Sequence, residues 1–223
     1  MSTAVHVRHH NSILAANEKR LLIWIAERLP RWINSDHLSA LGLASMAGAG
    51  ASFWVAQSDP VAGASLVVLC LILNWFGDSL DGTVARVRNQ QRPRYGYYVD
   101  HVIDLAGTAL LFGGVAVSGF MSPVIAAVVV AAFFLVSAET YLATHARGMF
   151  NMAFAGVGPT ELRILLAAGA LALVNTPRVA PFGIGPFLLW DIGGVVGAMG
   201  MATAFVISSG RNVRALYVEE TKR

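Results

Sequence analysis

Four aspartates beside long apolar segments constrain this chain more than any other feature. They occur as Asp78-x-x-Asp81 and Asp100-x-x-x-Asp104, and both pairs adjoin runs of apolar residues. A carboxylate is expensive to hold beside lipid, so such residues usually face an interior cavity and serve a function. Residues three or four apart share one face of a helix, so each pair projects together. A hairpin between the two helices would bring the pairs face to face.

Composition places the chain in a membrane. Of its 223 residues, 56% are hydrophobic and only 13% are charged, against about 25% charged in an ordinary soluble domain. A transmembrane helix needs roughly 20 mostly apolar residues, and six segments are candidates: residues 37–56, 61–84, 98–117, 123–143, 161–174 and 186–208. The fifth is short unless it begins near Pro159. The expected fold is all-α, an integral membrane bundle of six transmembrane helices.

Residues 12–33 precede these segments and are too short and too charged to span a bilayer. Leu21, Ile25 and Leu29 recur at helical spacing, and Trp24 and Trp32 are typical of membrane interfaces. We expect an N-terminal amphipathic helix on the membrane surface. The alternative is a linker helix that packs on the bundle without touching lipid. The chain then divides into residues 1–36 with the surface helix, the six-helix catalytic domain 37–210 and a tail 211–223.

The positions of the basic residues predict the orientation. Of the 16 lysines and arginines, only Arg178 falls on the side of the bundle opposite to both termini. By the positive-inside rule, the termini and the aspartates face the cytoplasm, across the inner membrane if the source is bacterial. This placement favours lipid head groups as partners of the basic residues, and it argues against nucleic acid.

The residue types of the aspartate segment indicate a metal-dependent reaction at phosphate. Four facing carboxylates need a counter-charge, and hard oxygen ligands without a cysteine or histidine cluster suit Mg²⁺ or Mn²⁺, with room for two ions. Gly82 and Gly96 permit a close approach to the backbone, and Ala85 leaves room beside Asp81. Arg86 is a ready partner for a phosphate. Together these residues suggest phosphoryl transfer.

The whole pattern, Asp78-x-x-Asp81-Gly82-x-x-Ala85-Arg86 followed by Gly96-x-x-x-Asp100-x-x-x-Asp104, resembles the signature of the CDP-alcohol phosphotransferases. These six-helix membrane enzymes of phospholipid synthesis move a substituted phosphate from a CDP-linked donor to an alcohol and release CMP. The resemblance implies that Asp104 is the general base, and members of the family often form homodimers. It also implies a metal site at Asp78, Asp81, Asp100 and Asp104, and a CDP site at Gly82, Ala85, Arg86 and Gly96.

The acceptor site is less defined. His101 gives Asp100-His101-x-x-Asp104, which resembles the choline and ethanolamine branch of the family, although a packing role beside the ligands fits equally well. The segment Gly158-Pro159-Thr160-Glu161 resembles the same branch, whereas Ala146-Arg147-x-x-Phe150-Asn151 is faintly similar to phosphatidylserine synthases. Candidates for recognising the acceptor are Arg147, Glu161 and Arg163, for which helix capping and inner-surface charge are the alternative roles.

The favoured interpretation is transfer of a phosphatidyl group from CDP-diacylglycerol to a polar alcohol. Transfer of a CDP-choline or CDP-ethanolamine head group to diacylglycerol is the alternative within the family. From another class, a cation transporter would also explain the aspartates. It would leave Gly82, Arg86 and Gly96 without a role, and it would place its site at one edge rather than near the midplane of the membrane.

Overall fold

The computed structural model describes residues 15–147 and 158–221, and the statements below concern these residues. The chain forms seven α-helices in this part: α1 (Ala15–Arg28), α2 (Ser35–Ser58), α3 (Pro60–Val87), α4 (Pro93–Val117), α5 (Pro123–Arg147), α6 (Pro159–Ala172) and α7 (Leu189–Thr221). A short antiparallel hairpin of β1 (Arg178–Val179) and β2 (Phe187–Leu188), with a 3-10 turn (Pro181–Gly183) between them, links α6 to α7. Residues 12–14 of the predicted surface helix, and Phe150 and Asn151, lie outside the described residues.

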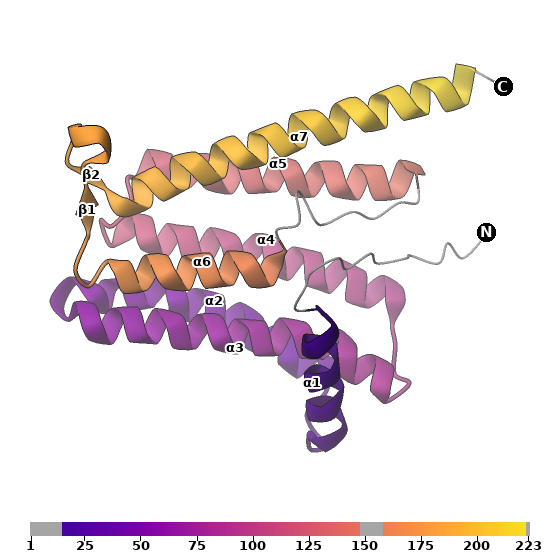
Figure 1. Ribbon diagram of the computed structural model, residues 1–223. Helices are drawn as coiled ribbons and strands as arrows, with labels where there is room; N and C mark the ends of the chain where they lie inside the picture. The colour runs from indigo at the N-terminus through magenta and orange to yellow at the C-terminus, as the bar shows by residue number, and fades with distance from the viewer. Residues whose placement is uncertain (1–14, 148–157, 222–223) are drawn as a thin grey trace.

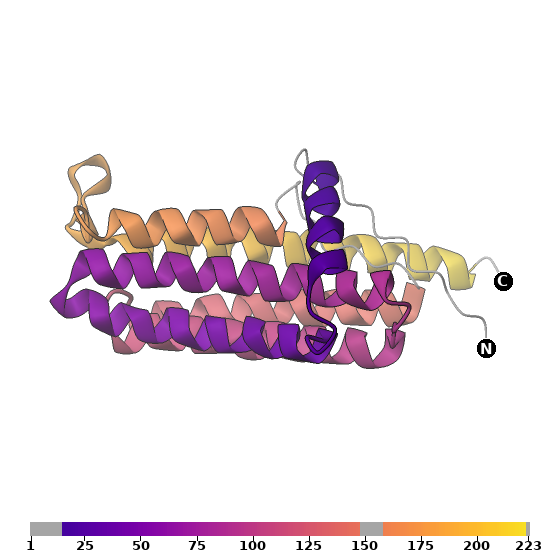
Figure 2. The same ribbon diagram turned by 90° about the horizontal axis from the view of Figure 1, so that it is seen from below.

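Helices α2 to α7 run alongside one another as a bundle, and α1 lies across their axes near one end (Figure 1). The view turned by 90° shows the same crossing (Figure 2). The β1–β2 hairpin lies at the opposite end of the bundle, whereas the C-terminal end of α7 lies at the end where α1 is found. The expected all-α membrane bundle is therefore confirmed.

Five helices, α2, α3, α4, α5 and α7, are long and apolar enough to cross a membrane. The sixth pass is α6, whose 14 residues measure about 21 Å at about 1.5 Å per residue. That is shorter than the hydrocarbon core of about 30 Å, so the count of six full spans is approximate. α4 begins at Pro93, five residues before the predicted start, because proline is well suited to a first helical turn. Gly96 consequently lies inside the helix.

α3 and α4 each pack on α2 with their backbones in near contact. A Cβ atom added to Gly77 of α3 would lie 2.5 Å from the carbonyl oxygen of Leu38 in α2. One added to Gly114 of α4 would lie 2.4 Å from the carbonyl carbon of Gly50 in α2. Small residues allow such approaches, which supply the van der Waals contact that holds helices together in lipid. Towards the hairpin end, Phe53 packs edge-on against Trp190 of α7, with the ring centroids 5.0 Å apart.

One face of α1 packs on the bundle, and another face is exposed. Leu22 and Ala26 are buried in a cluster with Leu38, Leu80 and Val84. Arg88, just after α3, donates hydrogen bonds to the carbonyls of Leu29 and Ile33 at 2.9 and 2.5 Å, beyond the end of α1. Trp24 nevertheless stays 54% exposed. The helix thus combines packing on the bundle with an apolar face suited to lipid, so neither predicted role excludes the other.

α7 continues to Thr221 without a break, so the boundary expected at residue 210 falls inside a helix. A polar network joins its C-terminal half to α5. The buried carboxylate of Glu139 accepts hydrogen bonds from Ser208 Oγ at 2.9 Å and Asn212 Nδ2 at 2.6 Å. Arg147 donates to Asn212 Oδ1 at 2.7 Å and lies 3.6 Å from Glu219. These contacts fix the C-terminal half of α7 beside α5.

Substitution of two adjacent glycines of α4 tests the close backbone contact between α4 and α2. Gly114→Ala should destabilise the protein by about 1–3 kcal/mol, since its Cβ must displace the Gly50 backbone. Gly113→Ala is the matched control, because nothing lies within 4 Å of the Cβ it would add. That variant should be neutral or stabilised by up to about 1 kcal/mol, since alanine is the better helix former. Thermal unfolding in detergent, followed by circular dichroism, measures both. Equal unfolding midpoints would refute the close contact.

Candidate active site

Asp78 lies where α3 meets α6. Its Oδ2 atom is 2.5 Å from Nη2 of Arg163, and the two side chains form an ion pair. Nε of the same arginine donates to Oδ1 of Asn74 at 2.7 Å. The Asn74 amide donates in turn to the carbonyl of Gly42 in α2 at 2.9 Å. Asn74 and Asp78 are four residues apart and so share a face of α3. One arginine therefore ties α6 to α3, and the buried asparagine extends the link to α2.

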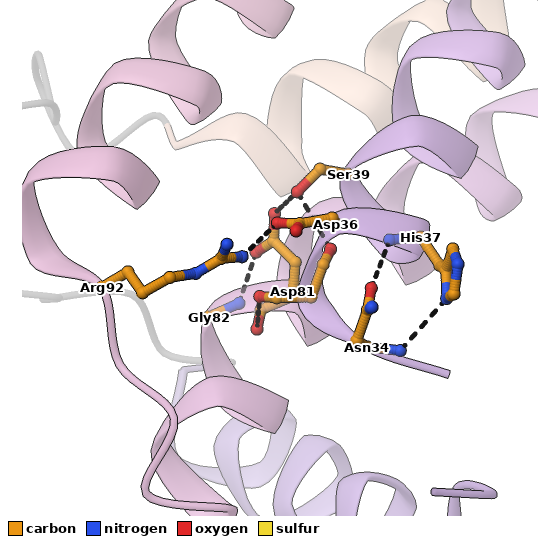
Figure 3. A network of polar contacts seen from close by, with 8 residues as sticks. Asn34, Asp36, His37, Ser39, Asp81, Gly82 and Arg92 are labelled. Atoms are coloured by element: carbon orange, nitrogen blue, oxygen red, sulfur yellow. Dashed lines mark hydrogen bonds and ion pairs between the residues drawn. The ribbon is translucent and has the colours of Figure 1, made fainter. Parts of the chain in front are cut away.

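Asp81, the next acidic residue of α3, is held against the beginning of α2. Ser39 Oγ donates to its Oδ2 at 2.6 Å, and the backbone N–H of Gly82 lies 2.5 Å from its Oδ1. Ser35 Oγ donates to the backbone carbonyl of Asp81. Figure 3 shows the carboxylate between Ser39 and Gly82, close to the ion pair of Arg92 with Asp36. The two aspartates of α3 thus point to different neighbouring helices, although they lie one turn apart.

α4 brings the second pair of aspartates to the same region. The Asp104 carboxylate interacts electrostatically with three other carboxylates and one guanidinium, those of Asp78, Asp81, Asp100 and Arg163. The side chain of Asp100 is 25% exposed. The carboxylates of α3 and α4 therefore lie within electrostatic range of one another, with the positive charge of Arg163 beside them, and their predicted meeting in one metal site stays a prediction.

His101 is packed among aromatic rings next to the aspartates. It is 5% exposed, and its ring centroid lies 4.1 Å from that of Tyr97 and 4.6 Å from that of Tyr141. Its Nδ1 is 3.6 Å from Oδ2 of Asp100. The sequence alternative of a packing residue beside the ligands describes this position, and the contact with Asp100 also leaves it within reach of the chemistry.

The donor atoms suit a hard divalent cation. Asp78, Asp81, Asp100 and Asp104 offer carboxylate oxygens only, which favours Mg²⁺ or Mn²⁺ over zinc. In the part of the chain that the structure describes, no three acidic, histidine or cysteine side chains form a group close enough to hold a metal. Arg163 engages Asp78 and Ser39 engages Asp81, which directs these two carboxylates apart. The donor chemistry fits the ion, and the metal site itself stays a prediction.

The residues predicted to line a nucleotide site lie at the end of the bundle where α1 is found. Ala85 borders a cavity of about 420 Å³, whose other walls are Asn34, Ser35, Asp36, Val84, Gln90, Gln91 and Arg92. A Cβ on Gly82 would lie 3.2 Å from Nη1 of Arg86, so glycine leaves room for this guanidinium. Arg86 also donates to Thr83 Oγ1 at 3.0 Å. Around Gly96 the structure is open, with nothing within 4 Å of an added Cβ.

The three candidates for acceptor recognition separate in space. Arg163 lies beside the aspartates, in an ion pair with Asp78. Glu161 accepts a hydrogen bond from the backbone N–H of Gly158 at 3.0 Å and thereby caps α6. Arg147 belongs to the network between α5 and α7 described above. Of the three, Arg163 contacts the carboxylate of Asp78, whereas Glu161 adopts the capping role considered as its alternative.

Sequence reasoning overlooked two residues of the site. Asn74 is 7% exposed and links Arg163 to α2; its signal is an amide within an apolar segment, four residues before Asp78. Tyr141 of α5 stacks on His101, and no local pattern distinguishes it from a lipid-facing aromatic residue. Helix pairing in three dimensions is needed to find it.

A protein of known structure shares the fold of this chain. No curated protein sequence matches the chain. Among solved structures, it is similar to the crystal structure of the Mycobacterium tuberculosis phosphatidylinositol phosphate synthase (PgsA1) with CDP-DAG bound, with a TM-score of 0.57 and 19% identity. The match covers 87% of this chain and 92% of that chain, and it concerns the fold. The CDP-alcohol phosphatidyltransferase family model matches residues 38–207, well over half of the sequence, so the chain belongs to the CDP-alcohol phosphatidyltransferase family.

Proposed function

We propose that this protein transfers a phosphatidyl group from CDP-diacylglycerol to the hydroxyl of a polar alcohol and releases CMP. One observation carries the proposal: Asp104 of α4 lies within electrostatic range of Asp78, Asp81 and Asp100, and Ala85, on the same helix as Asp78 and Asp81, borders a cavity. The family membership supports the reaction class. The CDP-DAG bound to the structurally similar synthase supports the donor.

In this reaction the acceptor oxygen forms a bond to the phosphorus that carries the diacylglycerol. The bond from that phosphorus to the bridging oxygen of the diphosphate breaks, and CMP leaves with the bonding electrons. The hydroxyl proton passes to Asp104, which acts as the general base. A carboxylate surrounded by other carboxylates is suited to accept a proton, because protonation relieves the repulsion between like charges.

Asp78, Asp81, Asp100 and Asp104 are the residues that would hold Mg²⁺ or Mn²⁺. When bound, such ions neutralise the charge that develops on the phosphate oxygens. Ser39 orients Asp81 through its hydrogen bond, and Asn74 orients Arg163. Both hydrogen bonds are short, so the Asp81 carboxylate and the Arg163 guanidinium are held in place before substrate binds.

The cavity beside Ala85 is a candidate for the cytidine part of the donor. The amide side chains of Asn34, Gln90 and Gln91 border it, and each amide offers both a donor and an acceptor to a base edge. The guanidinium of Arg86, accommodated by Gly82, is suited to the diphosphate. The diacylglycerol chains would then extend into lipid along the bundle, whose outer surface is apolar.

The position of Arg163 favours a polar or anionic acceptor that binds near Asp78. Its side chain is 15% exposed, so its charge acts at reduced screening. The same position also supports the alternative within the family, in which a CDP-linked amino alcohol is the donor and diacylglycerol the acceptor. The pattern Asp100-His101-x-x-Asp104 favours that alternative, and His101 lies 3.6 Å from Asp100, next to Tyr97 and Tyr141.

A donor and acceptor screen decides between these reactions. Purified protein should release CMP from labelled CDP-diacylglycerol in the presence of Mg²⁺ and one of serine, glycerol phosphate, inositol phosphate or another polar alcohol. Release from CDP-choline or CDP-ethanolamine with diacylglycerol would select the alternative. Cation uptake into proteoliposomes without any CMP release would favour the transporter. Omission of the acceptor controls for hydrolysis of the donor.

Substitution of two aspartates separates the base from the ligands. Asp104→Asn retains size and a carbonyl oxygen but cannot take the proton, and loss of a general base lowers kcat by about 10²–10⁴-fold. Its affinity for CDP should survive, because Asp78, Asp81, Asp100 and Arg86 remain. Asp81→Asn should weaken both Mn²⁺ and CDP binding.

Calorimetric titration with CDP, beside a turnover assay of each variant, makes the comparison. Near-native turnover of Asp104→Asn would show that Asp104 is not the base, and His101 would be tested next. Loss of CDP affinity as severe as that of Asp81→Asn would make Asp104 mainly a ligand.

The orientation of the protein in the membrane is tested separately. With the basic residues at the end of the bundle that holds the site, we propose that this end and both termini face the cytoplasm. A C-terminal fusion should then give fluorescence with green fluorescent protein and no activity with alkaline phosphatase. The reverse pattern would place the site away from the cytoplasmic pool of CDP-linked donors.

A further inference from the structure

The beginning of α6 has few apolar contacts to hold it in place. Among the residues of this helix, only Ala170, near its far end, is buried. Apolar packing gives little net drive to join helices within lipid, so polar contacts carry more of the association. At the first turns of α6 these contacts are the ion pair of Arg163 with Asp78 and a second bridge that starts from α1.

Glu18 of α1 forms this second bridge. Its Oε1 accepts a hydrogen bond from Trp75 Nε1 at 2.7 Å and lies 3.4 Å from the Thr160 hydroxyl. Trp75 is three residues before Asp78 on α3, and Thr160 is three residues before Arg163 on α6. Residues three apart lie on one face of a helix. Glu18 therefore joins the same two helices as the ion pair, one turn away from it.

The rest of α1 keeps Glu18 in place. Leu22, one turn further along α1, is buried against the bundle together with Ala26. Arg88 binds the carbonyls that follow the helix. α1 lies across the bundle close to the ends of its neighbours (Figure 2). Glu18 is thus presented by a helix that is itself seated on α3, and it is not a freely moving surface side chain.

We propose that Glu18 is a positioning residue for the active site. It holds α3 and α6 at the separation at which Arg163 meets Asp78, so that the surface helix α1 belongs to the framework of the reaction as well as to the membrane anchor. The catalytic part of this inference rests on the proposed phosphatidyl transfer. The structural part, the spacing of α3 and α6, does not.

Four single variants and one combination test the bridge. Glu18→Ala removes the acceptor, whereas Glu18→Gln keeps a carbonyl oxygen at Oε1 and should rescue the function. Glu27→Ala is the matched control, because Glu27 lies on the same helix, is 57% exposed and pairs with its exposed neighbour Arg28 at 3.9 Å. Trp75→Phe removes the donor from the opposite side. Combined with Glu18→Ala it should add no further loss, because Glu18→Ala already removes the acceptor of the Trp75 hydrogen bond.

Steady-state kinetics give the first readout. Glu18→Ala should lower kcat by about 10- to 100-fold, since a displacement of about 1 Å in a catalytic arrangement has an effect of this size. The KM for the CDP donor should stay within about twofold, since the cavity beside Ala85 has no α6 residue in its walls. Glu18→Gln should recover most of kcat, and Glu27→Ala should match the native protein.

Dipolar EPR gives a readout that needs no substrate. Spin labels at Ile72→Cys and Leu162→Cys, two exposed positions on α3 and α6, report the spacing of the helices in a Cys70→Ser background. Glu18→Ala should shift or broaden the distance distribution, and Glu18→Gln should restore it. An unchanged distribution and a native kcat in Glu18→Ala would overturn the inference while the proposed function stands. Absence of CMP release by the native protein would overturn the proposed function, and the EPR result would still decide the spacing.

Discussion

An ion inside a lipid-embedded bundle must have a partner, and the contact of Arg163 with Asp78 meets this requirement at the site. An unpaired charge at this depth would cost several kcal/mol. The guanidinium also reaches Asn74, whose amide continues to the backbone of α2. The position of α6, the direction of the Asp78 carboxylate and the contact between α2 and α3 all depend on this chain of polar groups. It is possible only because Gly77 lets the backbones of α2 and α3 approach closely.

The spacing of the aspartates predicts a shared helix face for each pair, because helical periodicity acts locally. It does not predict that Arg163 and Ser39 direct Asp78 and Asp81 towards different helices. The apolar runs likewise predict the helices of the bundle, to within a few residues at most ends. Proline and the caps explain the differences, as at Pro93, where α4 begins earlier than hydropathy alone suggests. The amphipathic pattern of residues 12–33 predicts the surface helix but not which of its faces meets the protein.

What escapes sequence reasoning is the pairing of helices that are far apart in the chain. Glu18 reads as one charge among several on a polar face, yet it contacts Trp75, 57 residues away, and Thr160, 142 residues away. Arg88 reads as an inner-surface charge, yet it binds the carbonyls that follow α1. Arg147 reads as a candidate for substrate and instead fastens α5 to α7. In each case the type of residue admits several roles, and only the tertiary neighbour selects one.

The length of α7 has a consequence for attaching other proteins to this one. Its 33 residues measure about 50 Å at about 1.5 Å per residue, roughly 20 Å more than the hydrocarbon core of a bilayer. The network from Glu139 to Glu219 ties the C-terminal half of α7 to α5, and the end of α7 extends beyond its neighbours (Figure 1). A folded domain fused after Thr221, so that α7 continues into it as one helix, would therefore stand clear of the membrane. Its rotation about the helix axis would be defined. Such a rigid handle would supply the mass and asymmetry that image alignment of a small membrane enzyme requires.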